Sequence, residues 1–203
     1  MSLIERLISK LQDYEPRSIE EDMPEAGILV PVTRNSREPE IIFTRRTQSL
    51  STHKGQVAFP GGKFDLSDKI IENTALRECH EEIGIKPEDV EIISPLSQVV
   101  SLHGIRVSPF VGLVPEDVEL TPNPAELDRV FKVPVDYFLT TEPIRRDKMT
   151  YKGIALSVPS YEYHDLGETY QIWGLSAIVV VELMNQAFDA DITIFDDYER
   201  SRL

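Results

Sequence analysis

Three glutamates lie close together in the stretch TALRECHEEIGI, residues 74–85: Glu78, Glu81 and Glu82. In a helix of about 100° per residue their side chains fall within one narrow sector, where like charges three or four positions apart repel each other. Converging carboxylate oxygens are the ligands that Mg²⁺ and Mn²⁺ prefer. The spacing therefore predicts a divalent-cation site whose ion offsets the repulsion. The alternative is an ordinary solvated acidic face.

The same helix has an apolar side that would face the core. Leu76, Cys79 and Ile83 lie on the face away from the glutamates. Arg77, one turn before Glu81, could hold a carboxylate in place, which favours a site over a disordered surface. A bound cation can neutralise phosphate oxygens and lower the pKa of a bound water. These residues therefore point to phosphate chemistry.

The elements that position this helix can be read upstream of it. Residues 27–33 and 40–46 are rich in β-branched residues and read as a pair of strands, with a third strand around 56–60. The glycines of PGGKFDLSD break the strand pattern. A helix over 69–83 follows, and Gly84 would end it as a C-cap. Strand, glycine loop and helix would thus present the glutamates.

The remaining chain adds strands and a closing helix. We expect strands within 90–101 and 105–115 joined near His103 and Gly104, a loop with short helical turns over 116–139, strands within 144–172, and a helix over 174–188. This mixed order predicts an α/β sandwich. We expect one domain over residues 1–203, with a helical extension at 1–24 and the glycine loop and catalytic helix at 55–85.

The composition excludes several classes of protein. A formal charge of −14 argues against nonspecific nucleic-acid binding. No apolar run approaches the length that crosses a bilayer. The first residues, MSLIERLISKLQDY, have the spacing of an amphipathic helix, and their charges interrupt any signal-peptide core. The single cysteine, Cys79, rules out an internal disulfide, so a cytoplasmic location is expected.

GGKFDLSDKIIENTALRECHEEIGI resembles the signature of the Nudix hydrolases. The residues that fill its second half are Arg77, Glu78, Cys79, Glu81, Glu82, Gly84 and Ile85. The resemblance implies an α/β/α sandwich with a mixed sheet. It also implies that the three glutamates bind Mg²⁺ or Mn²⁺ or orient metal-bound water, that Arg77 supports them, and that the carbonyl of Gly62 joins the coordination. His80, at the variable position, is expected to face solvent.

The first half of the signature departs from the family pattern. The loop between Gly62 and Arg77 is one residue longer than usual, and Lys69 stands where the family has a glutamate that pairs with the arginine. Three nearby acids could take its place: Asp65, Asp68 and Glu72. We favour Asp68.

The upstream segment IIFTRRTQSLSTHKGQVAFPGG resembles the extended motif of the coenzyme A pyrophosphatase branch of the family. The matching residues are Thr44, Arg45, Leu50, His53, Gly55, Gln56, Val57, Phe59, Pro60, Gly61 and Gly62. The branch tolerates the longer loop. The resemblance implies that Arg45, His53, Gln56 and Gly61 bind substrate, whereas Ser51 replaces an arginine of the motif.

Physical reasoning on that segment leaves two interpretations open. Arg45, Arg46, His53 and Lys54 are a local basic group in an acidic chain and could receive a polyphosphate. They could equally belong to an ordinary charged edge strand. Adjacent strand side chains point to opposite faces. Arg45 and Arg46 therefore cannot both face a ligand unless the strand bulges.

Downstream segments at 123–139 and 170–180 also resemble this branch. Glu126 lies in a loop where related enzymes bring in a catalytic or metal-binding carboxylate; the alternative is an acid at the start of a helix, favoured by the helix dipole. Phe131 and Trp173 are expected to be core residues rather than platforms for adenine.

The expected activity is metal-dependent hydrolysis of coenzyme A or an acyl-coenzyme A at its diphosphate. Two alternatives are hydrolysis of ADP-ribose or another nucleoside diphosphate derivative, and a non-catalytic module that senses a nucleotide. The expected partner is a small-molecule nucleotide, with no nucleic acid and no membrane. Members of the family can form homodimers, although no interface patch is evident in the sequence.

Overall fold

The computed structural model describes residues 1–47 and 55–195. Within them the helices are α1 (Leu3–Leu11), α2 (Ile71–Ile83), α3 (Val135–Thr140) and α4 (Gly174–Phe188), with 3-10 turns at Leu66–Asp68 and Pro87–Asp89. The strands are β1 (Glu25–Thr33), β2 (Glu40–Arg46), β3 (Val57–Ala58), β4 (Gly61–Lys63), β5 (Glu91–Pro95), β6 (Val99–Val100), β7 (Arg106–Val114), β8 (Leu127–Pro134), β9 (Arg145–Tyr151), β10 (Ile154–Asp165) and β11 (Glu168–Ile172).

The main sheet is mixed, as the sequence predicts. Its central path is β3-β2-β1-β7-β5, and β4, β6 and β8 pair with β1, β7 and β2 respectively. Strands β1 and β7 run parallel, whereas the other pairs are antiparallel. Both central strands are buried along almost their whole length, which explains their near-continuous apolar sequences. Strands β9, β10 and β11 form a second, antiparallel sheet.

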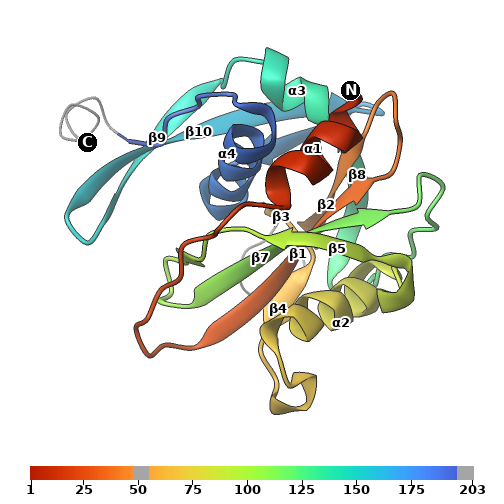
Figure 1. Ribbon diagram of the computed structural model, residues 1–203, viewed down its shortest axis with the longest axis horizontal. Helices are drawn as coiled ribbons and strands as arrows, with labels where there is room; N and C mark the ends of the chain where they lie inside the picture. The colour runs from red at the N-terminus through yellow and green to blue at the C-terminus, as the bar shows by residue number, and fades with distance from the viewer. Residues whose placement is uncertain (48–54, 196–203) are drawn as a thin grey trace.

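Helices cover both faces of the main sheet, so the α/β/α sandwich is confirmed (Figure 1). On one face, α2 buries Ala75, Cys79 and Ile83 against strand residues such as Leu29 and Ile42. On the other face, α1 and α4 pack together over the sheet. Each helix therefore contributes an apolar stripe to one of two cores. No helix of the described ranges is both long enough and apolar enough to span a bilayer.

Helix α2 begins two residues later than the sequence predicts. Lys69 has φ 67°, a left-handed conformation that ends the preceding 3-10 turn and cannot continue into a helix. The helix ends where expected: Gly84 has φ 80° and its N–H bonds the carbonyl of His80. The acidic residues of α2 therefore occupy a short, well-delimited helix.

The expectation for residues 116–139 is only partly right. Instead of helical turns after a loop, residues Leu127–Pro134 form strand β8, antiparallel to β2. Leu127, Phe131 and Val133 are buried while their neighbours are more exposed, a period of two that fits a strand better than a helix. Among residues 116–139, helical structure is confined to α3, immediately after β8, and this bears out the last part of the expectation. The strands expected within 144–172 and the closing helix α4 are confirmed.

Candidate active site

Glycines let the loop before α2 approach the helix and β1 closely. A Cβ on Gly27 would lie 2.5 Å from the carbonyl oxygen of Ile71, and one on Gly61 would lie 2.5 Å from the carbonyl oxygen of Gly27. A Cβ on Gly62 would meet the carboxylate of Glu78 at 2.3 Å. At Gly27 and Gly61 the obstacle is backbone, so only glycine leaves room, whereas at Gly62 it is the end of the Glu78 side chain. The loop backbone is thereby held directly against the acidic side of α2.

The three glutamates of α2 differ in burial. The side chain of Glu82 is 5% exposed, that of Glu78 is 19% exposed and that of Glu81 is 56% exposed. Arg77 Nη1 donates to Glu78 Oε1 at 2.7 Å and to Glu81 Oε2 at 3.1 Å. Glu82 Oε2 accepts instead from the N–H of Gly61 at 3.2 Å. The expected repulsion between the glutamates is therefore offset in part by one shared arginine.

Arg77 is itself fixed by the acid that the sequence favoured. Asp68 Oδ1 accepts from Arg77 Nε at 2.7 Å and Asp68 Oδ2 accepts from Arg77 Nη2 at 3.1 Å. Asp68 also accepts from the hydroxyl of Thr74 and the N–H of Asp65. The bidentate bond from Arg77 holds the pKa of Asp68 well below its ordinary value. Asp68 thus occupies the role left vacant by Lys69.

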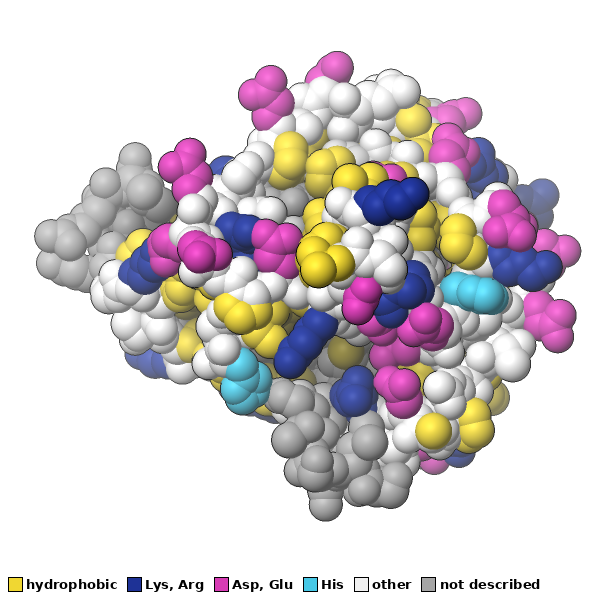
Figure 2. Space-filling model, turned by 90° about the horizontal axis from the view of Figure 1, so that it is seen from below, with side chains coloured by type: hydrophobic (Ala, Val, Ile, Leu, Met, Phe, Trp, Pro, Cys, Tyr) yellow, Lys and Arg dark blue, Asp and Glu magenta, His cyan; other side chains and the backbone are white. Residues whose placement is uncertain are grey.

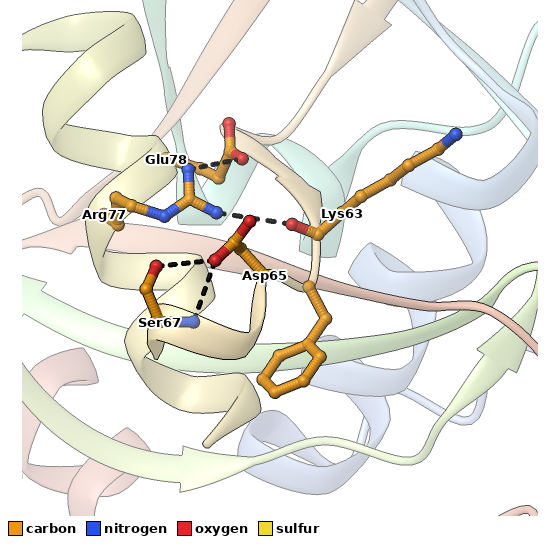
Figure 3. Close-up of a pocket in the computed structure, with 6 residues that line it drawn as sticks. Lys63, Asp65, Ser67, Arg77 and Glu78 are labelled. Atoms are coloured by element: carbon orange, nitrogen blue, oxygen red, sulfur yellow. Dashed lines mark hydrogen bonds and ion pairs between the residues drawn. The ribbon is translucent and has the colours of Figure 1, made fainter. Parts of the chain in front are cut away.

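A cavity of about 420 Å³ adjoins this network and is lined by Lys63, Phe64, Asp65, Ser67, Arg77 and Glu78. The guanidinium of Arg77 lies between Glu78 and the carbonyl of Lys63, to which Nη2 donates at 3.3 Å (Figure 3). Asp65 turns back to accept from Ser67 and caps the 3-10 turn. Asp65 therefore stabilises the loop and makes no ion pair with Arg77.

Glu82 has an unusual electrostatic environment. Burial raises its pKa to about 7, and the negative charges of Glu126 and Glu78 add to this effect. The N–H of Gly61 and the charge of Arg46 oppose it. A carboxylate held in this way gains from a nearby cation, and such perturbed groups are common at functional sites. The charge of Glu126 thus acts on Glu82 from the segment that precedes β8.

The donor set fits a hard divalent cation. All the candidate ligands on Glu78, Glu81 and Glu82 are carboxylate oxygens, which suit Mg²⁺ or Mn²⁺. Within residues 1–47 and 55–195, no three His, Cys, Asp or Glu side chains are already gathered as a ligand set. Arg77 draws Glu78 and Glu81 towards itself, and Glu82 turns to Gly61. Cation binding would therefore require these side chains to rearrange locally.

The two arginines at the end of β2 point in different directions. The pairing of β2 with β8 shifts register between Arg45 and Arg46, as in a β-bulge. Arg45 Nε donates to Asp128 at 2.7 Å and Nη1 donates to Glu168 at 3.0 Å. Arg46 Nη1 lies 3.9 Å from Glu82 Oε1. The structure therefore brings Arg46, and not Arg45, to the glutamates.

From the sequence, Arg45 was the predicted substrate contact, and Arg46 was named only as a member of a basic group whose role stayed open. A strand carries neighbouring side chains to opposite faces, so the adjacent pair indicates that one of the two arginines faces the site. The sequence does not indicate which one. Arg45 lies with its guanidinium carbon 5.3 Å from the ring centre of Tyr170, so it joins β2 to the second sheet. The ion pairs and the ring contact of Arg45 within the described residues are thus with β8 and β11, which gives it a supporting role.

A second cavity of about 370 Å³ adjoins the glycine loop. Arg46, Gln56 and Gly61 line one part of it, together with the half-buried Trp173. The expectation that Trp173 lies in the core is therefore wrong, because the residue is half-buried and lines a cavity. Phe131 is a core residue as expected, 4% exposed and stacked on Tyr170 at 3.8 Å.

The remaining candidates are placed as follows. His80 is exposed, as expected. Cys79 is fully buried, and burial raises the pKa of its thiol, so it stays protonated. Glu126 accepts through its carbonyl from the N–H of Thr47. His53 lies outside the residues that the structure describes, as do Leu50, Ser51 and Lys54.

Comparison with known proteins gives consistent results. Residues 23–152 match the family described as NUDIX domain. The chain is 35% identical over 171 residues to the Nudix hydrolase NudL of Photorhabdus laumondii, covering 84% of this chain and 89% of that protein. It is 34% identical over 179 residues to the peroxisomal coenzyme A diphosphatase NUDT7 of Mus musculus, covering 84% and 75%. A MutT/nudix family protein from Enterococcus faecalis superposes with a TM-score of 0.54 at 14% identity, over 93% of this chain and 70% of that one.

Proposed function

The chain belongs to the Nudix hydrolase family, and from this premise we propose that it hydrolyses the diphosphate of coenzyme A or of an acyl-coenzyme A. The products would be 3′,5′-ADP and 4′-phosphopantetheine or its acyl form. The observation that carries the substrate proposal is the 34% identity to a coenzyme A diphosphatase over 84% of the chain. The intact glutamates and their arginine support hydrolysis over a purely sensory role.

Glu78, Glu81 and Glu82 would hold Mg²⁺ or Mn²⁺ together with the carbonyl of Gly62. The bound cation would neutralise charge on the diphosphate and make a water molecule easier to deprotonate. Arg77 keeps Glu78 and Glu81 near each other before the cation arrives, because it donates to both. Glu78 and Glu81 are thus held close together by the protein itself, and both would have to turn from Arg77 towards the cation.

Other residues would act on the water and on the substrate. Glu126 is proposed as the additional carboxylate that orients the attacking water or completes the metal site, since its charge acts on Glu82. Gln56 and Gly61 are proposed to contact substrate from the wall of the second cavity, and Arg46 from beside Glu82. Arg45 would serve substrate binding by fixing the end of β2. A direct contact from His53 remains a prediction, and so do the cytoplasmic location and the homodimer.

The decisive experiment is a substrate panel with products identified by mass. Coenzyme A, 3′-dephospho-coenzyme A and ADP-ribose are incubated with the protein and either Mg²⁺ or Mn²⁺. Release of 4′-phosphopantetheine at a higher rate than cleavage of ADP-ribose is the expected result. Equal or faster cleavage of ADP-ribose would favour the alternative substrate. Nucleotide binding without turnover would make the protein a sensor.

A further inference from the structure

The second cavity adjoins the candidate active site and shares two residues with it. Gly61 belongs to both, because its N–H donates to Glu82 and its backbone lines the cavity. Arg46 also belongs to both, 3.9 Å from Glu82 and in the cavity wall. On the face seen from below in Figure 2, acidic, basic and apolar side chains adjoin one another. A diphosphate held beside Glu82 would therefore have one of its two substituents at the cavity mouth.

The cavity walls are mostly apolar. Strand, loop and helix residues supply them, among them Ile28, Phe59, Val107, Met149, Trp173 and Leu175. Among the described lining residues Arg46 is the sole Lys or Arg, and it lies at the end next to Glu82. The polar side chains that remain are Gln56, Ser101, His103 and Ser176. Such a wall suits a ligand of apolar carbon with a few neutral polar groups.

The two halves of coenzyme A differ in this respect. The nucleotide half carries a 3′-phosphate, whose burial without paired cations is costly. The pantetheine half is uncharged beyond its phosphate, with two amides and short alkyl segments. Resting on the function proposed above, we infer that this cavity binds the pantetheine arm, and that the nucleotide half lies outside it. A volume of about 370 Å³ is within the range of small-ligand pockets, and it accommodates a chain of that kind.

Substitutions on β9 separate this inference from its rival, in which the adenine half enters the cavity and stacks on Trp173. Met149→Lys places a positive charge in the apolar wall. Thr150→Lys adds the same charge at the next position of the strand, where the side chain points to the opposite face and is exposed. The charge that Met149→Lys introduces opposes an uncharged arm but attracts a phosphorylated nucleotide. Thr150→Lys is therefore the matched control.

Steady-state kinetics with coenzyme A and ADP-ribose give the first readout. Met149→Lys is expected to raise KM for coenzyme A about tenfold. This is the effect of withdrawing roughly two methylene groups of the pantetheine arm from the apolar wall. KM for ADP-ribose, which has no pantetheine, should change by less than about twofold. Thr150→Lys should change neither. A lowered KM for coenzyme A, or equal effects on both substrates, would overturn the inference.

A binding measurement on the unsubstituted protein keeps the test independent of variant folding and of turnover. Trp173 is the only tryptophan of the chain, so its fluorescence reports on the cavity wall. Without metal, 4′-phosphopantetheine should change that fluorescence and 3′,5′-ADP should not. The reverse result would overturn the inference. Coenzyme A could be hydrolysed while the fluorescence changes and the KM values of Met149→Lys both differ from these expectations. In that case the cavity inference fails and the proposed function stands. If coenzyme A is neither hydrolysed nor bound, the proposed function fails with it.

Discussion

Glu82→Gln should stabilise the metal-free protein while abolishing its activity. Burial places the pKa of Glu82 at about 7 in the folded chain, against an ordinary value of 4.5. Between these values the unfolded chain is deprotonated while the folded chain keeps the proton, so stability falls as pH rises. The glutamine carries no charge and can still accept the hydrogen bond from Gly61. The substitution therefore removes the cost of ionising a buried carboxyl without opening a cavity.

The size of the effect follows from the difference between the two pKa values. A pKa raised from 4.5 to about 7 corresponds to about 3 kcal/mol at full ionisation. We expect Glu82→Gln to raise the free energy of unfolding by about 2–3 kcal/mol at pH 8, or roughly 5–10 °C in Tm for a chain of this size. At pH 5, just above the pKa of Glu82 in the unfolded chain, the increase in the free energy of unfolding should shrink to below about 1 kcal/mol.

Urea unfolding at pH 5 and pH 8, in EDTA, measures both values. Glu81→Gln is the matched control, because that side chain is 56% exposed and its amidation should not stabilise the fold. Adding Mn²⁺ should then stabilise the unsubstituted protein and have much less effect on Glu82→Gln. A Glu82→Gln protein that is less stable at pH 8, or whose gain does not depend on pH, would show that Glu82 is a structural acid and would refute this reasoning.

Three further substitutions test the rest of the site. Asp68→Asn weakens the bidentate bond to Arg77 and should lower the free energy of unfolding by about 2 kcal/mol, a value reduced because Arg77 is partly exposed; thermal unfolding measures it. Gly62→Ala places a Cβ 2.3 Å from the carboxylate of Glu78, so turnover should fall about tenfold or more while Tm changes little, because a flexible side-chain end gives way. Arg46→Ala should raise KM for every diphosphate substrate about tenfold with unchanged Tm, which parallel kinetics and melting curves would test.

The helix and glycine loop of the site could be predicted because local sequence determines them. The apolar spacing of Cys79 and Ile83, the glycine pair before the helix and the Gly84 cap are all short-range signals, and each is confirmed. Asp68 could also be identified, since few acids lie within reach of Arg77. Each of these features depends on residues that are close to one another in the sequence.

The features that could not be predicted depend on contacts between distant segments. Strand β8 was missed because its apolar alternation is short and interrupted by charges, and its identity as a strand comes from pairing with β2. Arg46 could not be preferred over Arg45 because a register shift in that same pairing decides which arginine faces Glu82. Trp173 was misplaced because the cavity it lines is formed by segments far apart in the chain. A single sequence carries no signal for such packing.

Asp68 and Glu82 show how the fold separates support from chemistry. Both are nearly fully buried carboxylates beside the same loop, yet their pKa values move in opposite directions. Arg77 bonds Asp68 through two nitrogens, whereas Arg46 Nη1 lies 3.9 Å from Glu82 Oε1, beyond hydrogen-bond distance. Asp68 is therefore satisfied within the protein, and Glu82 is left with a cost that a cation from solution can relieve. When the pKa values of two carboxyl groups in one site are shifted in opposite directions, the group without a bonded cationic partner is the better candidate for the reaction.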